Sequence, residues 1–176
     1  MRLLATDIDG VLVVEPELLR DGRGWFAELF SSKVLPFNPV QMNESRSRHG
    51  VVRGLHFQEQ PFAQAKLVRC TSGRIIDVAV DMRPGSPSFG RSVRVELSAR
   101  NRRLIFIPKG FAHGFSVLSS SANVQYLCDV VYHPEADGGI NPLDPALGID
   151  WGLPREEMIL KEKDLTRPCL KDLSKL

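Results

Sequence analysis

The sequence predicts an all-β protein, a sandwich or barrel for which a jelly roll is the natural form. From residue 40 onward, short runs rich in β-branched and aromatic residues alternate with turn residues at close spacing. Segments with helical periodicity are scarce, apart from one possible helical turn near residues 155–158. Many short strands with close turns must pair into two sheets or a barrel to bury their apolar faces.

The individual strands follow from these runs and the turns between them. At the N-terminus, Asp9-Gly10 predicts a turn that leads into a strand at residues 11–15. Gln41 and Asn43 alternate toward one face of a further strand. The remaining predicted strands are residues 51–55, 65–70, 74–81, 93–97 and 104–107, separated by Gly, Pro and Asn turn signals.

Length and charge limit the possible functions. The 176 residues are 43% hydrophobic, which predicts one domain over residues 1–176 with a sizeable core. A net charge of +2, from 23 basic and 21 acidic residues, argues against a nucleic-acid or membrane-surface partner. The three cysteines are scattered and odd in number, and no long apolar segment occurs, so we expect a cytoplasmic protein with reduced thiols.

The N-terminal residues Asp7-Ile8-Asp9-Gly10 suggest an alternative. An apolar strand followed by this pattern begins the aspartate-nucleophile phosphatases, whose paired carboxylates hold magnesium. Those enzymes need a long alternation of strands and helices, which this sequence lacks. A simple turn is therefore the preferred interpretation.

The Gly-rich segment at residues 21–30 predicts a turn that opens an alternating strand. Arg23, between two glycines, could close on a phosphate, and Phe26 and Glu28 would share one face of the strand. An aromatic ring beside a carboxylate suits a planar base with an N–H to donate. The structural alternative is an exposed edge strand with an Arg–Glu pair.

Residues 53–68 concentrate more polar chemistry than a packed core tolerates. They carry Arg53, His56 and Lys66 on two predicted neighbouring strands joined by a Pro-containing loop. A buried unpaired charge costs several kcal/mol, so these side chains should face water, each other or a ligand. The segment therefore predicts the wall of a pocket.

A second polar cluster spans residues 108–115, with both tyrosines of the chain, Tyr126 and Tyr132, beyond it. His113 in this cluster is by itself most simply a structural residue. A metal site would need a His-x-His pair and a further carboxylate, whereas Phe57-Gln58 follows His56, so no metal is expected.

These segments together resemble the dTDP-4-dehydrorhamnose 3,5-epimerase family over nearly the whole chain. The segments that carry the resemblance are Asp21-Gly22-Arg23-Gly24, Arg53-Gly54-Leu55-His56-Phe57-Gln58, Gln64-Ala65-Lys66-Leu67-Val68, Asp77-Val78-Ala79-Val80-Asp81-Met82-Arg83, Gly85-Ser86-Pro87-Ser88-Phe89-Gly90, Ile107-Pro108-Lys109-Gly110-Phe111-Ala112-His113-Gly114-Phe115, Asp144-Pro145, Ile149-Asp150-Trp151 and Lys163-Asp164.

The resemblance implies a cupin-type jelly roll (double-stranded β-helix) with short peripheral helical segments, and a homodimer that needs no cofactor. The implied substrate is dTDP-4-dehydro-6-deoxy-D-glucose, from the rhamnose pathway. Its C3 and C5 protons flank the C4 ketone, so removal of either leaves an enolate that can be reprotonated from the opposite face. Such a reaction needs a base, an oxyanion partner and an acid.

By position, the resemblance assigns a role to each candidate. His56 matches the base, Asp164 the carboxylate that holds its tautomer, Lys66 the partner of the enolate oxygen and Tyr126 the acid. The expected substrate-binding residues are Arg23 and Arg53 at the pyrophosphate, Phe26 and Glu28 at the thymine, Tyr132 at the sugar, and Gln41, Asn43, His113 and Lys163 along the pocket, with Arg23 and its neighbours reaching into the site of the partner.

The chain departs from the family pattern at Trp25, at residues 137–138, at residues 141–143 and at residues 161–162. The departures cluster around Tyr132 and Asp164 and leave two alternatives open. One is a mono-epimerase that acts at C3 or C5 only, on another dTDP-deoxysugar. The other is a cupin that binds nucleotide sugars without catalysis.

Overall fold

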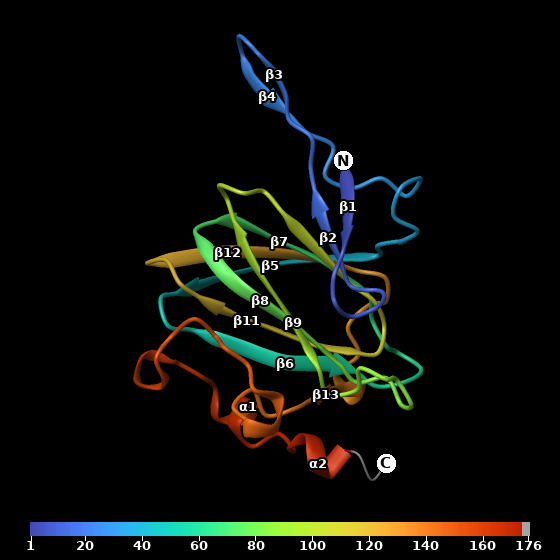
Figure 1. The fold of residues 1–176 in the computed structure, drawn as a ribbon, viewed down its shortest axis with the longest axis vertical. Coiled ribbons are helices and arrows are strands. Elements are labelled where there is room, and N and C mark those ends of the chain that lie inside the picture. Colours follow the sequence, from blue (N-terminus) through green and yellow to red (C-terminus); the bar gives the residue numbers. More distant parts are fainter. Residues whose placement is uncertain (174–176) are drawn as a thin grey trace.

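Two antiparallel sheets face each other in the computed structural model, which describes residues 1–173 (Figure 1). The six-stranded sheet has the order β1-β2-β10-β7-β12-β5, and the five-stranded sheet has the order β13-β6-β11-β8-β9. The strands are β1 (Arg2–Ala5), β2 (Leu12–Glu15), β5 (Gln41–Arg48), β6 (Val52–Gln58), β7 (Lys66–Ser72), β8 (Arg74–Asp81), β9 (Ser92–Ser98), β10 (Leu104–Ile107), β11 (Phe111–Val117), β12 (Ser121–Cys128) and β13 (Asp137–Gly139). The predicted cupin-type jelly roll is confirmed.

The main core fills the space between the sheets. Val68 and Val124 from one sheet pack with Ile75, Ala79 and Phe115 from the other, all buried. Because side chains alternate along a strand, Ile76, Val78 and Val80 of β8 point outward. They are nevertheless buried, because the C-terminal segment covers that face of the five-stranded sheet.

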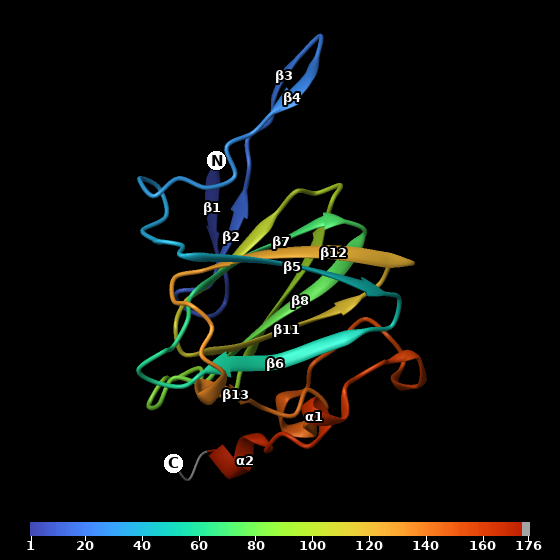
Figure 2. The same ribbon diagram turned by 180° about the vertical axis from the view of Figure 1, so that it is seen from behind.

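Figure 2 shows this C-terminal segment, in orange and red, lying against β6. It holds the 3₁₀ helices η1 (Pro134–Ala136), η2 (Pro145–Leu147) and η3 (Arg155–Glu157), and the short helices α1 (Glu162–Leu165) and α2 (Leu170–Leu173). Trp151, Leu147 and Ile140 pack from it against Val78 and Val80 of β8. The helical turn expected near residues 155–158 is therefore present as η3.

Residues 29–37 cover the outer face of the six-stranded sheet in the same way. Leu35 and Phe37 are buried against Leu67 and Leu104. Each sheet thus has an apolar cover on its outer face, which leaves the space between the sheets as the place where polar side chains can line a cavity.

One detail of the sequence prediction is wrong: residues 53–68 do not form two neighbouring strands. β6 belongs to the five-stranded sheet and β7 to the six-stranded sheet, so the two strands face each other across the interior. The segment supplies two opposite walls of the cavity, because the loop between them crosses from one sheet to the other.

The N-terminal strands form a hairpin, with Ala5 opposite Leu12. The turn between them contains Asp7 and Asp9 and is held by Thr6, whose hydroxyl lies 3.0 Å from the Val11 carbonyl oxygen. The sheets are antiparallel throughout, so the doubly wound phosphatase fold is excluded.

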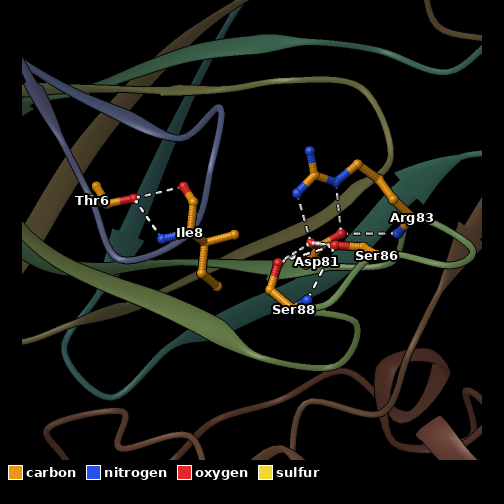
Figure 3. A network of polar contacts seen from close by, with 6 residues as sticks. All are labelled: Thr6, Ile8, Asp81, Arg83, Ser86 and Ser88. Carbon is orange, nitrogen blue, oxygen red and sulfur yellow. Dashed lines mark hydrogen bonds and ion pairs between the residues drawn. The ribbon is translucent and has the colours of Figure 1, made fainter.

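The loop after β8 is fixed by a buried carboxylate. Asp81 is 0% exposed and accepts hydrogen bonds from the Arg83 guanidinium at 2.9 and 2.7 Å (Figure 3). The hydroxyls of Ser86 and Ser88 donate to the same carboxylate at 2.7 and 2.6 Å. These bonds close the turn that follows the strand.

A separate hairpin, β3 (Leu19–Asp21) and β4 (Gly24–Phe26), projects from the barrel (Figures 1 and 2). All of its residues are exposed, and Phe26 keeps 68% of its surface in contact with solvent. Within residues 1–173, no helix has the length and apolar character needed to cross a bilayer.

Candidate active site

A cleft with two lobes lies between the sheets. The first lobe has a volume of about 340 Å³ and the second about 320 Å³. His56, Lys66 and Tyr126 line both lobes and therefore stand at their junction. These are three of the four residues that the sequence assigns to catalysis.

The fourth, Asp164, lines the first lobe and holds the imidazole of His56. Its Oδ1 lies 2.7 Å from His56 Nε2, and the residue is only 3% exposed. A buried carboxylate at this distance fixes which ring nitrogen carries a proton and stabilises the imidazolium form. The other nitrogen, Nδ1, remains available for proton transfer.

Backbone contacts of the C-terminal segment bring Asp164 to this position. Ile159 N donates to Gly50 O at 2.8 Å, and Val52 N donates to Ile159 O at 2.9 Å. Gly50 has φ +81, and a side chain there would overlap the Glu157 carbonyl oxygen. The close approach of the segment to β6 therefore requires glycine at this position.

Lys66 and Tyr126 come from the opposite sheet. Lys66 pairs with Cys128 and Tyr126 pairs with Val68, so the two side chains lie on the same, inner face of the sheet. Burial raises the pKa of the Tyr126 phenol, which keeps it protonated at neutral pH. Burial also lowers the pKa of the Lys66 ammonium, although the charges of Cys128, Asp77 and Asp137 act in the opposite direction.

Arg53 and His113 line the first lobe. Arg53 Nε donates to Ser47 Oγ at 3.0 Å, which orients the guanidinium fork. His113 Nε2 lies 3.1 and 2.9 Å from the two carboxylate oxygens of Asp77. A guanidinium held at Nε presents its terminal nitrogens to an anion, and phosphoryl oxygens suit that geometry.

Gln41, Asn43 and Tyr132 line the second lobe. The side chains of Gln41 and Asn43 are joined by a 2.9 Å hydrogen bond, and Gln41 Oε1 accepts from Tyr132 N at 2.7 Å. Their polar groups are thus ordered along one wall. The predicted alternation of Gln41 and Asn43 toward one face is confirmed.

Arg23, Phe26 and Glu28 are not brought to the cleft. Arg23 lies on the projecting hairpin and donates to Asp21 Oδ2 at 2.6 Å. The prediction that Phe26 and Glu28 share a strand face is wrong, because β4 ends at Phe26. Lys163 is also absent from the lining of both lobes, and its ammonium lies 2.7 Å from Asp137 Oδ2.

Several residues in or behind the cleft wall were missed by the sequence analysis. Ser45 lines the first lobe with a buried hydroxyl that has no hydrogen-bond partner within the described chain. Asp137 lines the second lobe, and Asp77 lies behind His113. An aspartate inside the otherwise apolar run of β8 was a usable signal, since carboxylates are almost never fully buried unless paired.

The arrangement suits proton transfer on two sides of one bound molecule. His56 projects from the five-stranded sheet, whereas Tyr126 and Lys66 project from the six-stranded sheet. A base and an acid from facing walls, with a cation beside them, can remove a proton from one face of a ring and return it to the other. Across residues 1–173, no three His, Cys, Asp or Glu side chains gather as metal ligands would.

Comparisons with known proteins agree with this geometry. A family model described as dTDP-4-dehydrorhamnose 3,5-epimerase matches residues 5–172. The enzyme of that name from Methanothermobacter thermautotrophicus is 49% identical over 93% of this chain and 91% of its own length. The one from Escherichia coli K12 is 48% identical over 95% and 97%.

Solved structures of relatives superpose closely. The dTDP-4-dehydrorhamnose 3,5-epimerase of Elizabethkingia anophelis has a TM-score of 0.94 at 44% identity, covering 98% of this chain and 97% of its own. An epimerase of Legionella pneumophila in complex with dTDP-4-keto-L-rhamnose scores 0.90 at 45% identity, covering 97% and 93%. A 3'-monoepimerase of Streptomyces bikiniensis in complex with dTDP-quinovose scores 0.86 at 35% identity, covering 94% and 86%.

Fold, cleft and sequence therefore point the same way: this chain belongs to the dTDP-4-dehydrorhamnose 3,5-epimerase family.

Proposed function

We propose that the protein epimerises dTDP-4-dehydro-6-deoxy-D-glucose at C3 and C5, giving dTDP-4-dehydro-L-rhamnose for dTDP-L-rhamnose synthesis. Relatives of that name, nearly half identical over almost the whole chain, support this activity. The observation that carries it is the position of His56 and Tyr126, which project from opposite sheets into the junction of the two lobes.

In each half of the reaction, His56 takes the proton from the carbon next to the ketone. The electron pair of the broken C–H bond moves into an enolate, whose oxygen is stabilised by the Lys66 ammonium. Asp164, held 2.7 Å from Nε2, stabilises the imidazolium that forms. Tyr126 then gives its phenol proton to the opposite face of the same carbon, which inverts that centre. Before the second carbon reacts, His56 gives its proton to water and Tyr126 regains one from water.

The remaining predicted residues bind the rest of the substrate. Arg53, held by Ser47, and His113, held by Asp77, are the polar side chains of the first lobe that suit a diphosphate. Gln41, Asn43 and Tyr132 line the second lobe. Lys163 contributes indirectly, because it binds Asp137 in the wall of that lobe.

Arg23, Phe26 and Glu28 act in a second copy of the chain, within a homodimer. The observation that supports this is the exposure of the β3–β4 hairpin, on which three large apolar side chains, Leu19, Trp25 and Phe26, lie together in solvent as they would at an interaction surface. A hairpin that reaches across a two-fold axis would supply an aromatic ring and a guanidinium to the cleft of the partner. We further propose that residues 1–176 form one domain of a cytoplasmic enzyme.

A mono-epimerase is the second candidate, favoured by the similarity to the 3'-monoepimerase of Streptomyces bikiniensis. Both candidates use the same base and acid and differ in how many carbons react. A catalytically silent cupin that binds nucleotide sugars would need Arg53 but neither His56 nor Tyr126.

Proton NMR of the purified protein with dTDP-4-dehydro-6-deoxy-D-glucose in deuterated water, without added metal, tests all three. Loss of signal at both C3 and C5 is the expected result. Exchange at one carbon would assign the mono-epimerase. Exchange at neither, with the ligand bound, would reject catalysis and leave the binding protein.

A further inference from the structure

Asp77 is a buried carboxylate for which the proposed mechanism has no use. It is 0% exposed in the middle of β8, and both of its oxygens lie within hydrogen-bond distance of His113 Nε2. Taking a carboxylate out of water costs several kcal/mol unless an opposite charge and hydrogen bonds compensate. His113 supplies the hydrogen bond and, when protonated, an opposite charge, and a second cation adds to that compensation.

The direction in which Asp77 points identifies that second cation. Ile75 and Ala79, two residues before and after it, belong to the core between the sheets, whereas Ile76 and Val78 belong to the outer cluster. Alternation along the strand therefore turns Asp77 inward, toward the six-stranded sheet that carries Lys66. Burial raises the pKa of the Asp77 carboxyl, and the charge and hydrogen bond of His113 and the charge of Lys66 act against that rise.

Three groups can hold Lys66 in its charged form against burial: Cys128, Asp77 and Asp137. Burial raises the pKa of the Cys128 thiol, so at neutral pH it is uncharged. Asp137 is already bound by Lys163 at 2.7 Å and by Arg167. Within residues 1–173, no hydrogen bond or ion pair engages the Lys66 ammonium itself. Asp77 is thus the anion whose charge is left for Lys66.

His56 faces Lys66 across the cleft from β6, and Tyr126 lies on β12, next to the strand of Lys66 in the same sheet. At neutral pH the phenol is uncharged, and protonation of His56 during the reaction adds a second cation to the same space. That cation lowers the affinity of Lys66 for its proton at the moment when the enolate oxygen needs it. A fixed buried anion opposes this loss.

We propose that Asp77 is a positioning residue, which orients the His113 imidazole with both carboxylate oxygens and keeps the Lys66 ammonium charged from behind the cleft wall. The catalytic use of this role of Asp77 rests on the proposed epimerase function, but the charge of Lys66 can be measured without substrate. A merely structural Asp77 would affect folding stability and leave that charge unchanged.

The test follows the titration of Lys66 by NMR in protein labelled with ¹³C at the lysine Cε, with the signal assigned by its absence in Lys66→Arg. In Asp77→Asn, Lys66 should lose its proton at a lower pH than in the wild type. The alkaline limb of kcat/KM should move the same way, with the loss at a fixed alkaline pH reaching about tenfold for each pKa unit. An unchanged Lys66 midpoint in the folded variant would overturn the proposal.

Asp144→Asn is the matched control, because Asp144 is also buried, caps η2 and lies outside the lining of both lobes. In this variant, Lys66 should titrate at the same pH as in the wild type. If Asp77→Asn does not fold, the reciprocal variant Lys66→Met tests the proposal instead. Loss of the Lys66 cation must raise the pKa of Asp77. The ¹³C signal of the Asp77 carboxyl group measures that pKa. If Asp77 titrated at the same pH in Lys66→Met as in the wild type, the proposed interaction between the two charges would be rejected. This outcome does not depend on whether the wild type exchanges substrate protons.

Discussion

At the scale of single residues, three side chains at the junction of the lobes determine which chemistry the cleft performs. In the proposed mechanism, His56 is a base only in the tautomer that Asp164 selects, and Tyr126 is an acid only while its phenol stays protonated. Lys66 contributes only as a cation, which burial opposes. The protonation state of each group depends on a neighbouring residue or on its burial, so each role can be tested by a single substitution.

Replacing His56 with Asn should abolish proton exchange at both carbons, because it removes the imidazole that takes the proton. We expect a loss of at least about a hundredfold in turnover, the usual contribution of a general base. The measurement is loss of the C3 and C5 proton signals in deuterated water. Affinity for dTDP, measured by calorimetry as the control, should stay near the wild-type value, and turnover that matched the wild type would refute the role of base.

Replacing Tyr126 with Phe removes the acid and leaves the base in place. Abstraction should therefore continue while delivery of a proton to the opposite face slows, so deuterium appears in recovered substrate faster than product forms. The comparison needs both rates from the same NMR series. Equal losses in exchange and product would show that Tyr126 is not the acid.

At the scale of elements, buried polar contacts fix the ends of strands whose middle parts form the cleft. Asp81 closes the loop after β8 through Arg83, Ser86 and Ser88. The Ile159 backbone ties the C-terminal segment to β6 and so delivers Asp164. The contacts of Asp81 stabilise the scaffold away from both lobes, whereas Ile159 also lines the first lobe.

Asp81→Asn should lower the free energy of unfolding by about 3 kcal/mol at neutral pH, the usual cost of breaking a buried ion pair. Burial alone would raise the pKa of Asp81, but hydrogen bonds from Arg83, Ser88 and Ser86 outweigh it and hold that pKa well below the usual range. Because the pKa of Asp81 is lower in the folded than in the unfolded protein, its charge stabilises the fold at pH values above the unfolded-state pKa, near 4. This stabilisation is lost as the pH falls further.

Urea unfolding of wild type and variant at several pH values measures this difference. The gap between the two proteins should be full at neutral pH and should shrink below about pH 4. A gap that stayed constant into strong acid would show that the carboxylate charge is not what stabilises the loop.

At the scale of the whole molecule, a single chain leaves part of the predicted site outside its own cleft. The β3–β4 hairpin carries Arg23 and Phe26 into solvent, away from the lobes that hold His56 and Tyr126 (Figure 1). A site completed by a second copy explains both the exposure and the sequence assignment.

Mixed dimers of Arg23→Ala and His56→Asn test this sharing. Each mixed dimer would contain one cleft with an intact His56 and an intact Arg23 from its partner. Co-expressed, differently tagged chains in equal amounts should therefore recover about a quarter of wild-type turnover. If Arg23 served its own subunit, the mixture would be no more active than the two variants measured separately.

The amino-acid sequence was enough to predict the architecture and the polar side chains that line the cleft. Alternating strands and close turns predict two packed sheets, because period-2 patterns can bury a face in no other way. The polar side chains of the segment 53–68 predict a pocket wall, since unpaired charges do not remain in a core. His56, Lys66 and Tyr126 meet at the lobe junction as the family resemblance implies.

Only the tertiary structure decided how those residues face one another. Sheet membership depends on pairings between distant strands, so residues 53–68 supply opposite walls although they are consecutive in the chain. The length of β4 and the projection of its hairpin depend on packing that no local pattern encodes. Asp77 is a further example. The sequence shows a carboxylate within an apolar strand, but its partners His113 and Lys66 come from other strands and are known only from the fold.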